Sequence, residues 1–139
     1  MLFYDWQFAD RIQCSLKDKQ ECFDLFIRLR EYASKVHQGG FLALEDELKN
    51  IDDEFLRTSI QMGIDGVTPD LFREIQDRRI LVDNCKGKEL LARVVITEAM
   101  SSILDEDNFE VFHYKVLSYF GDSGQQWAQD HKLDLIGTI

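Results

Sequence analysis

The stretch KELLARVVITEAMSSIL, residues 88–104, decides the fold class of this 139-residue chain. Its apolar side chains recur three and four residues apart, which is the spacing of one face of an α-helix. They are Leu90, Leu91, Val94, Val95, Ala99, Ile103 and Leu104. The face that they form is wide, so we expect this helix to be well buried.

Helical periodicity also dominates the rest of the chain, and no stretch shows convincing period-two alternation rich in β-branched residues. An amphipathic helix is predicted over about residues 18–36, and Gly39-Gly40 ends it. A short helix should follow, with apolar residues at Phe41, Leu42, Leu44, Leu48 and Ile51. Further helices are predicted on both sides of residues 88–104, together with a last helix in the tail that carries Trp127, Leu133, Leu135 and Ile136. The predicted fold is all-α, a single compact domain over residues 1–139 with six or seven helices joined by short turns.

The clearest boundary between helices is Gly66-Val67-Thr68-Pro69. Gly66 can take the left-handed position after a helix, Thr68 can cap the next helix, and Pro69 suits its first position. Asp52 or Asp53 can cap the helix that ends at Gly66. These signals separate two helices in the middle of the chain.

The charge balance argues against nucleic acid as a partner. The chain has 26 acidic and 16 basic residues and a formal net charge of −10. Residues 1–69 and 70–139 each hold 13 acids and 8 bases, so each half carries −5. A phosphate backbone repels such a chain unless basic residues are segregated. The cluster Arg73, Arg78 and Arg79 is interleaved with Glu74 and Asp77, and we interpret it as a solvated helix face.

Several features predict a location in the cytoplasm. No apolar run exceeds four residues, far below the roughly 20 that a membrane-spanning helix needs. We therefore expect no direct membrane insertion, and the start of the chain lacks the pattern of a secretory signal. The three cysteines, Cys14, Cys22 and Cys85, have no CxxC spacing, so we expect reduced thiols and interpret Cys14 and Cys22 as buried structural residues.

No pattern of catalytic or metal-binding residues emerges. His37, His113 and His131 lie on separate predicted elements, and each is expected to be exposed or at the edge of the core. None has a second His or Cys at helical metal spacing. The acids of Asp105-Glu106-Asp107 are better explained by helix capping than by calcium binding, since the glycine and final glutamate of a calcium loop are missing. Phosphate-binding glycine loops and GxSxG are absent. We therefore predict no enzyme activity, cofactor or metal.

Four short motifs occur in order: Gly40-Phe41-Leu42-Ala43-Leu44-Glu45, Asp53-Glu54-Phe55-Leu56-Arg57, Ile64-Asp65-Gly66 and Pro69-Asp70-Leu71-Phe72-Arg73-Glu74-Ile75. Together they resemble the cytoplasmic segment of MotA, the A subunit of the bacterial flagellar stator. The resemblance covers residues 28–80, and the helices of residues 88–139 have no recognised match. MotA has four transmembrane helices, whereas this chain continues with charged helices after the matched segment.

The resemblance implies a contact with the rotor protein FliG through an arginine and a glutamate eight residues later. The glutamate maps onto Glu45, whereas His37 stands at the arginine position with Lys35 nearby. An imidazole does not replace a guanidinium fork. We take Lys35, His37, Glu45 and Glu47 as the predicted protein-binding residues. The leading hypothesis is a cytoplasmic, non-enzymatic interaction module that docks a FliG-like rotor partner at the flagellar motor by charge complementarity.

Two other functions stay open. One is a helical adaptor or regulator outside motility that keeps the stator-like helices only for packing. The other is an enzyme with a small-molecule pocket among its helices. Self-association into a homo-oligomer is compatible with each of the three.

Overall fold

Only helices occur as regular secondary structure in residues 4–131, the part of the chain that the computed structural model describes. The α-helices are α1 (Trp6–Arg11), α2 (Leu16–Gly39), α3 (Glu54–Ile64), α4 (Pro69–Asp83), α5 (Gly87–Leu104), α6 (Phe109–Leu117) and α7 (Ser123–Asp130). Two 3₁₀-helices, η1 (Phe41–Asn50) and η2 (Ser118–Phe120), complete the described part. The predicted all-α fold is confirmed, and the predicted number of helices is close. A single compact domain stays a prediction.

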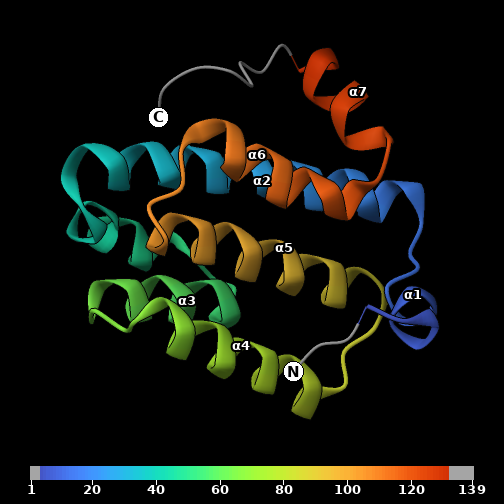
Figure 1. Cartoon of the computed structure of the whole chain (residues 1–139), viewed down its shortest axis with the longest axis horizontal. Coiled ribbons are helices and arrows are strands. Elements are labelled where there is room, and N and C mark those ends of the chain that lie inside the picture. The colour runs from blue at the N-terminus through green and yellow to red at the C-terminus, as the bar shows by residue number, and fades with distance from the viewer. Residues whose placement is uncertain (1–3, 132–139) are drawn as a thin grey trace.

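Helix α5 is the centre of the molecule. It packs against α2 and α6 on one side and against α3 and α4 on the other (Figure 1). Its predicted burial is confirmed and extends further round the helix than the apolar face alone, because Thr97, Ser101 and Ser102 are buried too. Neighbouring helices therefore cover most of α5, and its exposed charged residues, Lys88 and Glu89, lie in its first turn.

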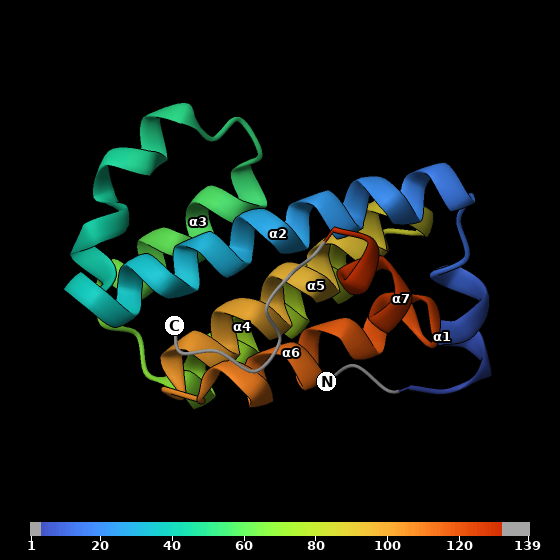
Figure 2. The ribbon, with the colours of Figure 1, turned by 90° about the horizontal axis from the view of Figure 1, so that it is seen from above.

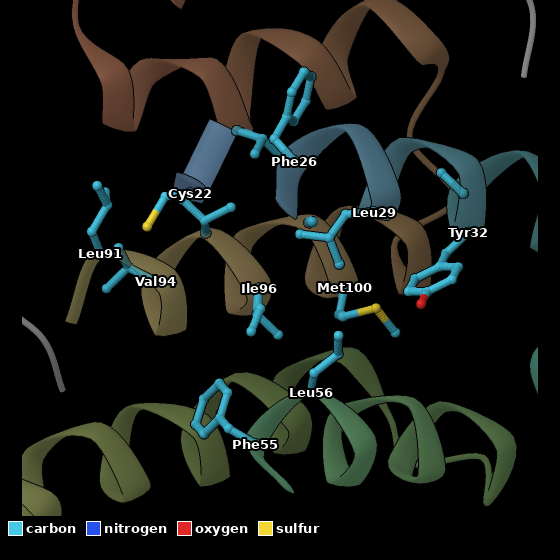
Figure 3. Packing of buried hydrophobic residues seen from close by; sticks show 14 of the residues in the cluster. Cys22, Phe26, Leu29, Tyr32, Phe55, Leu56, Leu91, Val94, Ile96 and Met100 are labelled. Carbon is cyan, nitrogen blue, oxygen red and sulfur yellow. The ribbon is translucent and has the colours of Figure 1, made fainter. Parts of the chain in front are cut away.

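Helix α2 supplies the other large part of the core. It runs across α5 (Figure 2). Its side chains Phe26 and Leu29 are fully buried. Leu29 points toward α5, whereas Phe26 points to the other side (Figure 3), where its ring stacks on Phe112 of α6. The helix begins at Leu16 because the hydroxyl of Ser15 accepts a hydrogen bond from the backbone N–H of Asp18. It ends at Gly39, and the capping residue Gly40 that follows has a φ of +72°, which suits glycine.

The boundaries around α3 and α4 agree with the sequence. Asp53 caps α3 by accepting a hydrogen bond from the N–H of Phe55, and Pro69 is the first residue of α4. Gly66 has a φ of +79°. Thr68 occupies the capping position of α4, but its side chain makes no capping hydrogen bond.

The short helix predicted after Gly40 is present as η1. It is a 3₁₀-helix, with three residues per turn, and not an α-helix. Its apolar residues do not all lie on one face of this helix. Leu44 is fully buried, whereas Leu42 keeps 67% of its surface exposed.

The interpretation of the α4 arginines as a solvated face is wrong for two of the three. Arg73 donates a hydrogen bond to Glu98 of α5 at 2.6 Å. The guanidinium of Arg79 lies 4.4 Å from the centre of the Phe55 ring and stacks on it. Arg78 is exposed, as predicted. Residue spacing alone does not show which arginines fold back over a neighbouring helix.

The expectation for the histidines is wrong for His113, which is 2% exposed. Its Nε2 accepts a hydrogen bond from Arg30 at 2.9 Å, and its Nδ1 lies 2.7 Å from the backbone oxygen of Phe109. A histidine can be buried when both ring nitrogens have partners. Cys22 and Cys85 are buried, whereas Cys14 is only half-buried.

The remaining expectations concern the membrane and the tail. In residues 4–131, no helix combines the length and the apolar character that crossing a membrane requires. The predicted last helix is present as α7 and includes Trp127. Leu133, Leu135 and Ile136 lie outside the described residues.

Candidate functional site

The four predicted contact residues come from two consecutive elements. Lys35 and His37 lie in the last turns of α2, and Glu45 and Glu47 lie on η1, which packs against both α2 and α3. The α2–η1 corner is at the end of the molecule opposite α1 (Figures 1 and 2). We call the exposed part of this corner, residues 35–49, the η1 surface.

Lys35 and Glu47 form an ion pair across the corner. The hydrogen bond to Glu47 raises the pKa of Lys35, so the ammonium stays charged. Lys35 is exposed and Glu47 half-buried. Because each charge already has a partner within the chain, this pair ties η1 to α2 and leaves less charge for another molecule.

Phe41 fixes the other side of η1. Its ring lies directly over Gly63 of α3, where a Cβ atom would stand only 2.3 Å from Cε1 of Phe41. Only glycine leaves room for this approach of a ring to a helix backbone. Together with the burial of Leu44, the contact holds η1 as a fixed ridge on the surface.

Leu42 and Glu45 share the outer side of this ridge. Three residues make one turn of a 3₁₀-helix, so these two side chains lie above one another. Both side chains are exposed, and Glu45 forms no ion pair and no side-chain hydrogen bond with residues 4–131. A large apolar side chain therefore stands beside an acidic group that has no partner in residues 4–131.

His37 is one of the residues that line an open cavity of about 610 Å³. Its walls come from the end of α2, the start of η1, the end of α5 and the start of α6. The lining residues are Ala33, Val36, His37, Gly40, Phe41, Ser102, Ile103, Leu104, Glu106, Asp107 and Phe112. The cavity thus adjoins the η1 surface without including Glu45.

The polar groups of this cavity are mostly engaged with one another. The hydroxyl of Ser102 donates a hydrogen bond to Asp107 at 2.7 Å, and Lys115 pairs with the same carboxylate. Burial alone would raise the pKa of Asp107, but the hydrogen bonds from Lys115 and Ser102 outweigh it and lower the pKa. A nucleophilic serine needs a base as its hydrogen-bond partner. The acceptor of the Ser102 hydroxyl hydrogen bond is the Asp107 carboxylate, whose charge Lys115 balances.

The four residues predicted from the sequence, Lys35, His37, Glu45 and Glu47, lie at one corner of the structure, and exposed Leu42, which the sequence did not single out, lies beside them. The sequence listed Leu42 with Leu44 among the apolar residues of the short helix, without separating the exposed one from the buried one. The signal that separates them is a three-residue period, with Phe41, Leu44 and Glu47 on the inner side and Leu42 and Glu45 on the outer side. Groups of three or more His, Cys, Asp or Glu able to hold a metal ion are absent from residues 4–131.

Comparison with known proteins agrees with the motifs around this corner. Part of the chain resembles Motility protein A. The Motility protein A of Treponema phagedenis is 36% identical over 53 residues, as is that of Treponema pallidum (strain Nichols). The Motility protein A of Bacillus subtilis (strain 168) is 30% identical over 57 residues. These matches cover about two-fifths of the chain, 38% to 41%.

The match covers little of those relatives. The aligned part of the chain spans about a fifth of the length of each of these Motility protein A sequences, 20% to 21%. No family model matches the chain. No solved structure matches it either.

Proposed function

We propose that this chain is a non-enzymatic protein-interaction module of bacterial motility that docks a partner on its η1 surface. The observation that carries the proposal is the pairing of exposed Leu42 with exposed Glu45 on a 3₁₀-helix that is fixed on both sides. The partial resemblance to Motility protein A supports the link to motility. We further propose a location in the cytoplasm at the flagellar motor.

The fixed ridge favours binding because little ordering is needed. Lys35–Glu47 and Phe41–Gly63 hold the backbone of η1 before a partner arrives. Side chains that are ordered in advance lose less entropy on association. Leu42 would provide apolar contact area, and Glu45 would set the orientation by pairing with a basic residue.

The proposed partner is a rotor protein of the FliG type with a basic or mixed-charge helix. The net charge of −10 favours approach of a basic surface in general terms. Glu45 supplies the specific contact. His37 is the second proposed contact, but Lys35 and Glu47 act mainly by holding η1 in place, because they pair with each other.

Binding of the purified chain to a FliG-like rotor protein from the same cell tests the proposal. Isothermal titration calorimetry should show saturable binding. Because a charge reversal replaces attraction by repulsion, we expect Glu45→Lys to weaken binding by about tenfold or more. Leu42→Ser should weaken it by a similar factor through lost apolar contact.

Asp46→Lys is the matched control. Asp46 is an exposed acid on η1 that lies on a different side of the 3₁₀-helix from Glu45. It changes the net charge by the same amount, so it separates a local contact from general steering. Absence of binding would reject the rotor partner. Equal effects of Glu45→Lys and Asp46→Lys would reject the Leu42–Glu45 contact.

A further inference from the structure

The open cavity of about 610 Å³ beside the η1 surface is not used by the Leu42–Glu45 contact proposed above. Four elements line it, α2, η1, α5 and α6, and they meet at the end of the molecule opposite α1 (Figures 1 and 2). Its volume falls within the range of small-molecule binding sites, about 300–1,000 Å³. The chemistry of its walls shows which kind of ligand would fit.

Apolar side chains form much of the wall. Ala33 and Phe112 are buried. Val36, Ile103 and Leu104 are half-buried and also line the cavity. A ligand that contacts these side chains removes apolar surface from water, which favours binding. The wall is therefore suited to a ligand with an apolar body.

The charged groups of the wall are acids. Lysine and arginine are absent from the lining residues in the described part of the chain. Asp107 is already paired, because its carboxylate accepts hydrogen bonds from Ser102 and Lys115. Glu106 is exposed and forms no ion pair and no side-chain hydrogen bond with residues 4–131. Its negative charge is therefore available to a ligand.

Two helix ends add to this negative potential. Both α2 and α5 end at the cavity, since Val36 and Ile103 lie in their last turns. The C-terminal end of an α-helix carries about half a negative elementary charge. The N-terminal end of α6, which has the opposite sign, is also near, but the side chain of Asn108 caps it by accepting a hydrogen bond from Val111. The cavity therefore favours a cation over an anion.

The backbone of Glu106 is strained. Its φ is +58°, in the left-handed region. Its N–H donates to the carbonyl of Ile103, and the N–H of Asp107 donates to the carbonyl of Ser102, both at 3.1 Å. In this type of helix ending, glycine or asparagine usually occupies the left-handed position. A glutamate there costs stability, and residues under such strain are found mostly at functional sites.

We propose that this cavity binds a small organic ammonium ion with an apolar body, such as an arylalkyl amine. The ammonium group pairs with the carboxylate of Glu106, and the apolar body contacts Val36, Ile103 and Leu104. His37 lines the same cavity, and a neutral imidazole nitrogen can accept a second hydrogen bond from the ammonium group. Because neither Leu42 nor Glu45 lines the cavity, the site can be tested separately from the docking of a protein partner.

Nuclear magnetic resonance titration of the isotope-labelled full chain with phenethylamine tests the proposal. At pH 7 the alkylamine is charged, and about 0.15 M salt limits general attraction to the acidic chain, because the Debye length is then about 8 Å. We expect saturable changes in the backbone amide shifts of Val36, Ile103 and Glu106. Phenylethanol lacks the charge and methylamine lacks the ring, so each should bind at least about tenfold more weakly than phenethylamine.

A pair of matched variants tests the role of Glu106. Glu106→Gln removes the charge and keeps the shape, so it should raise the dissociation constant of phenethylamine by about tenfold or more. Asp105→Asn is the control. Asp105 is an exposed acid at the neighbouring position that does not line the cavity, and the substitution changes the net charge by the same amount. It should leave the dissociation constant unchanged.

Glu106→Gly separates ligand binding from a structural role. Glycine adopts a positive φ without strain, so this variant should melt at a higher temperature than the wild type and still lose affinity as Glu106→Gln does. A glutamate that served only the fold would not combine these two effects. The proposal would be overturned by absence of saturable shifts, by equal binding of phenethylamine and either comparison compound, by equal effects of Glu106→Gln and Asp105→Asn, or by a lower melting temperature of Glu106→Gly.

Discussion

The contact of Phe41 with Gly63 gives the most direct test of how η1 is held. In Gly63→Ala, the new methyl carbon would lie 2.3 Å from Cε1 of Phe41 and 2.4 Å from its Cδ1. Carbon atoms prefer separations of about 3.5–4.0 Å, so the ring must retreat by roughly 1.2 Å or more. Such a shift separates η1 from α3.

Two opposing effects set the magnitude. Overpacking costs about 1–3 kcal/mol. Alanine favours the interior of a helix over glycine by about 1 kcal/mol. The net loss of unfolding free energy in the single variant is therefore up to about 2 kcal/mol. In a Phe41→Ala background the ring is gone, and the same Gly63→Ala change should stabilise the protein by about 1 kcal/mol.

Urea unfolding followed by far-ultraviolet circular dichroism measures all four proteins: wild type, both single variants and the double variant. The double-mutant cycle should give a coupling free energy of roughly 2 kcal/mol between the two positions. If Gly63→Ala has the same effect with and without the Phe41 ring, the proposed contact does not hold η1.

Three further predictions concern other parts of the fold. The pKa of Asp107 is lowered, so the stability that its carboxylate adds should be fully present above about pH 4. This stability should be lost as pH falls through the lowered pKa. The difference in melting temperature between wild type and Asp107→Asn should therefore disappear in acid. Burial raises the pKa of Cys22 to about 11, so alkylation at neutral pH, read by mass spectrometry, should modify half-buried Cys14 before Cys22. Gln76 donates a buried hydrogen bond to the Ser59 hydroxyl at 2.6 Å, and Gln76→Leu should lower the unfolding free energy in urea by about 1–3 kcal/mol. Unchanged stability at every pH, equal alkylation, or a neutral Gln76→Leu would contradict the respective argument.

Local sequence signals predicted the helices because most of them act within a few residues. Gly66 and Pro69 mark a boundary through backbone conformations that depend on the residue itself. Asp53 caps α3 through a hydrogen bond to a residue two positions away. The apolar face of residues 88–104 predicted a buried helix without any knowledge of which helices would pack against it. These features needed no knowledge of the tertiary structure.

Contacts between residues far apart in the sequence determined which polar side chains are buried, and the spacing of apolar residues could not predict this. His113 is buried because Arg30, 83 positions away, donates a hydrogen bond to it. Arg73 is half-buried because it donates a hydrogen bond to Glu98 of another helix. The apolar residues of η1 do not show by themselves whether the segment forms an α-helix or a 3₁₀-helix, so the three-residue period that turns Leu42 outward became apparent only in the structure.

The sequence by itself therefore determined an acidic, all-helical chain with a stretch similar to Motility protein A. It also indicated that Lys35, His37, Glu45 and Glu47 belong together, since they lie within 13 consecutive positions. Only the tertiary structure divided them into a pair that holds the corner, Lys35 and Glu47, and an acid that faces outward, Glu45. The physical reason is that the Lys35–Glu47 ion pair and the contact of the Phe41 ring with Gly63 join different helices. The spacing of residues along the sequence does not give the distance between two helices.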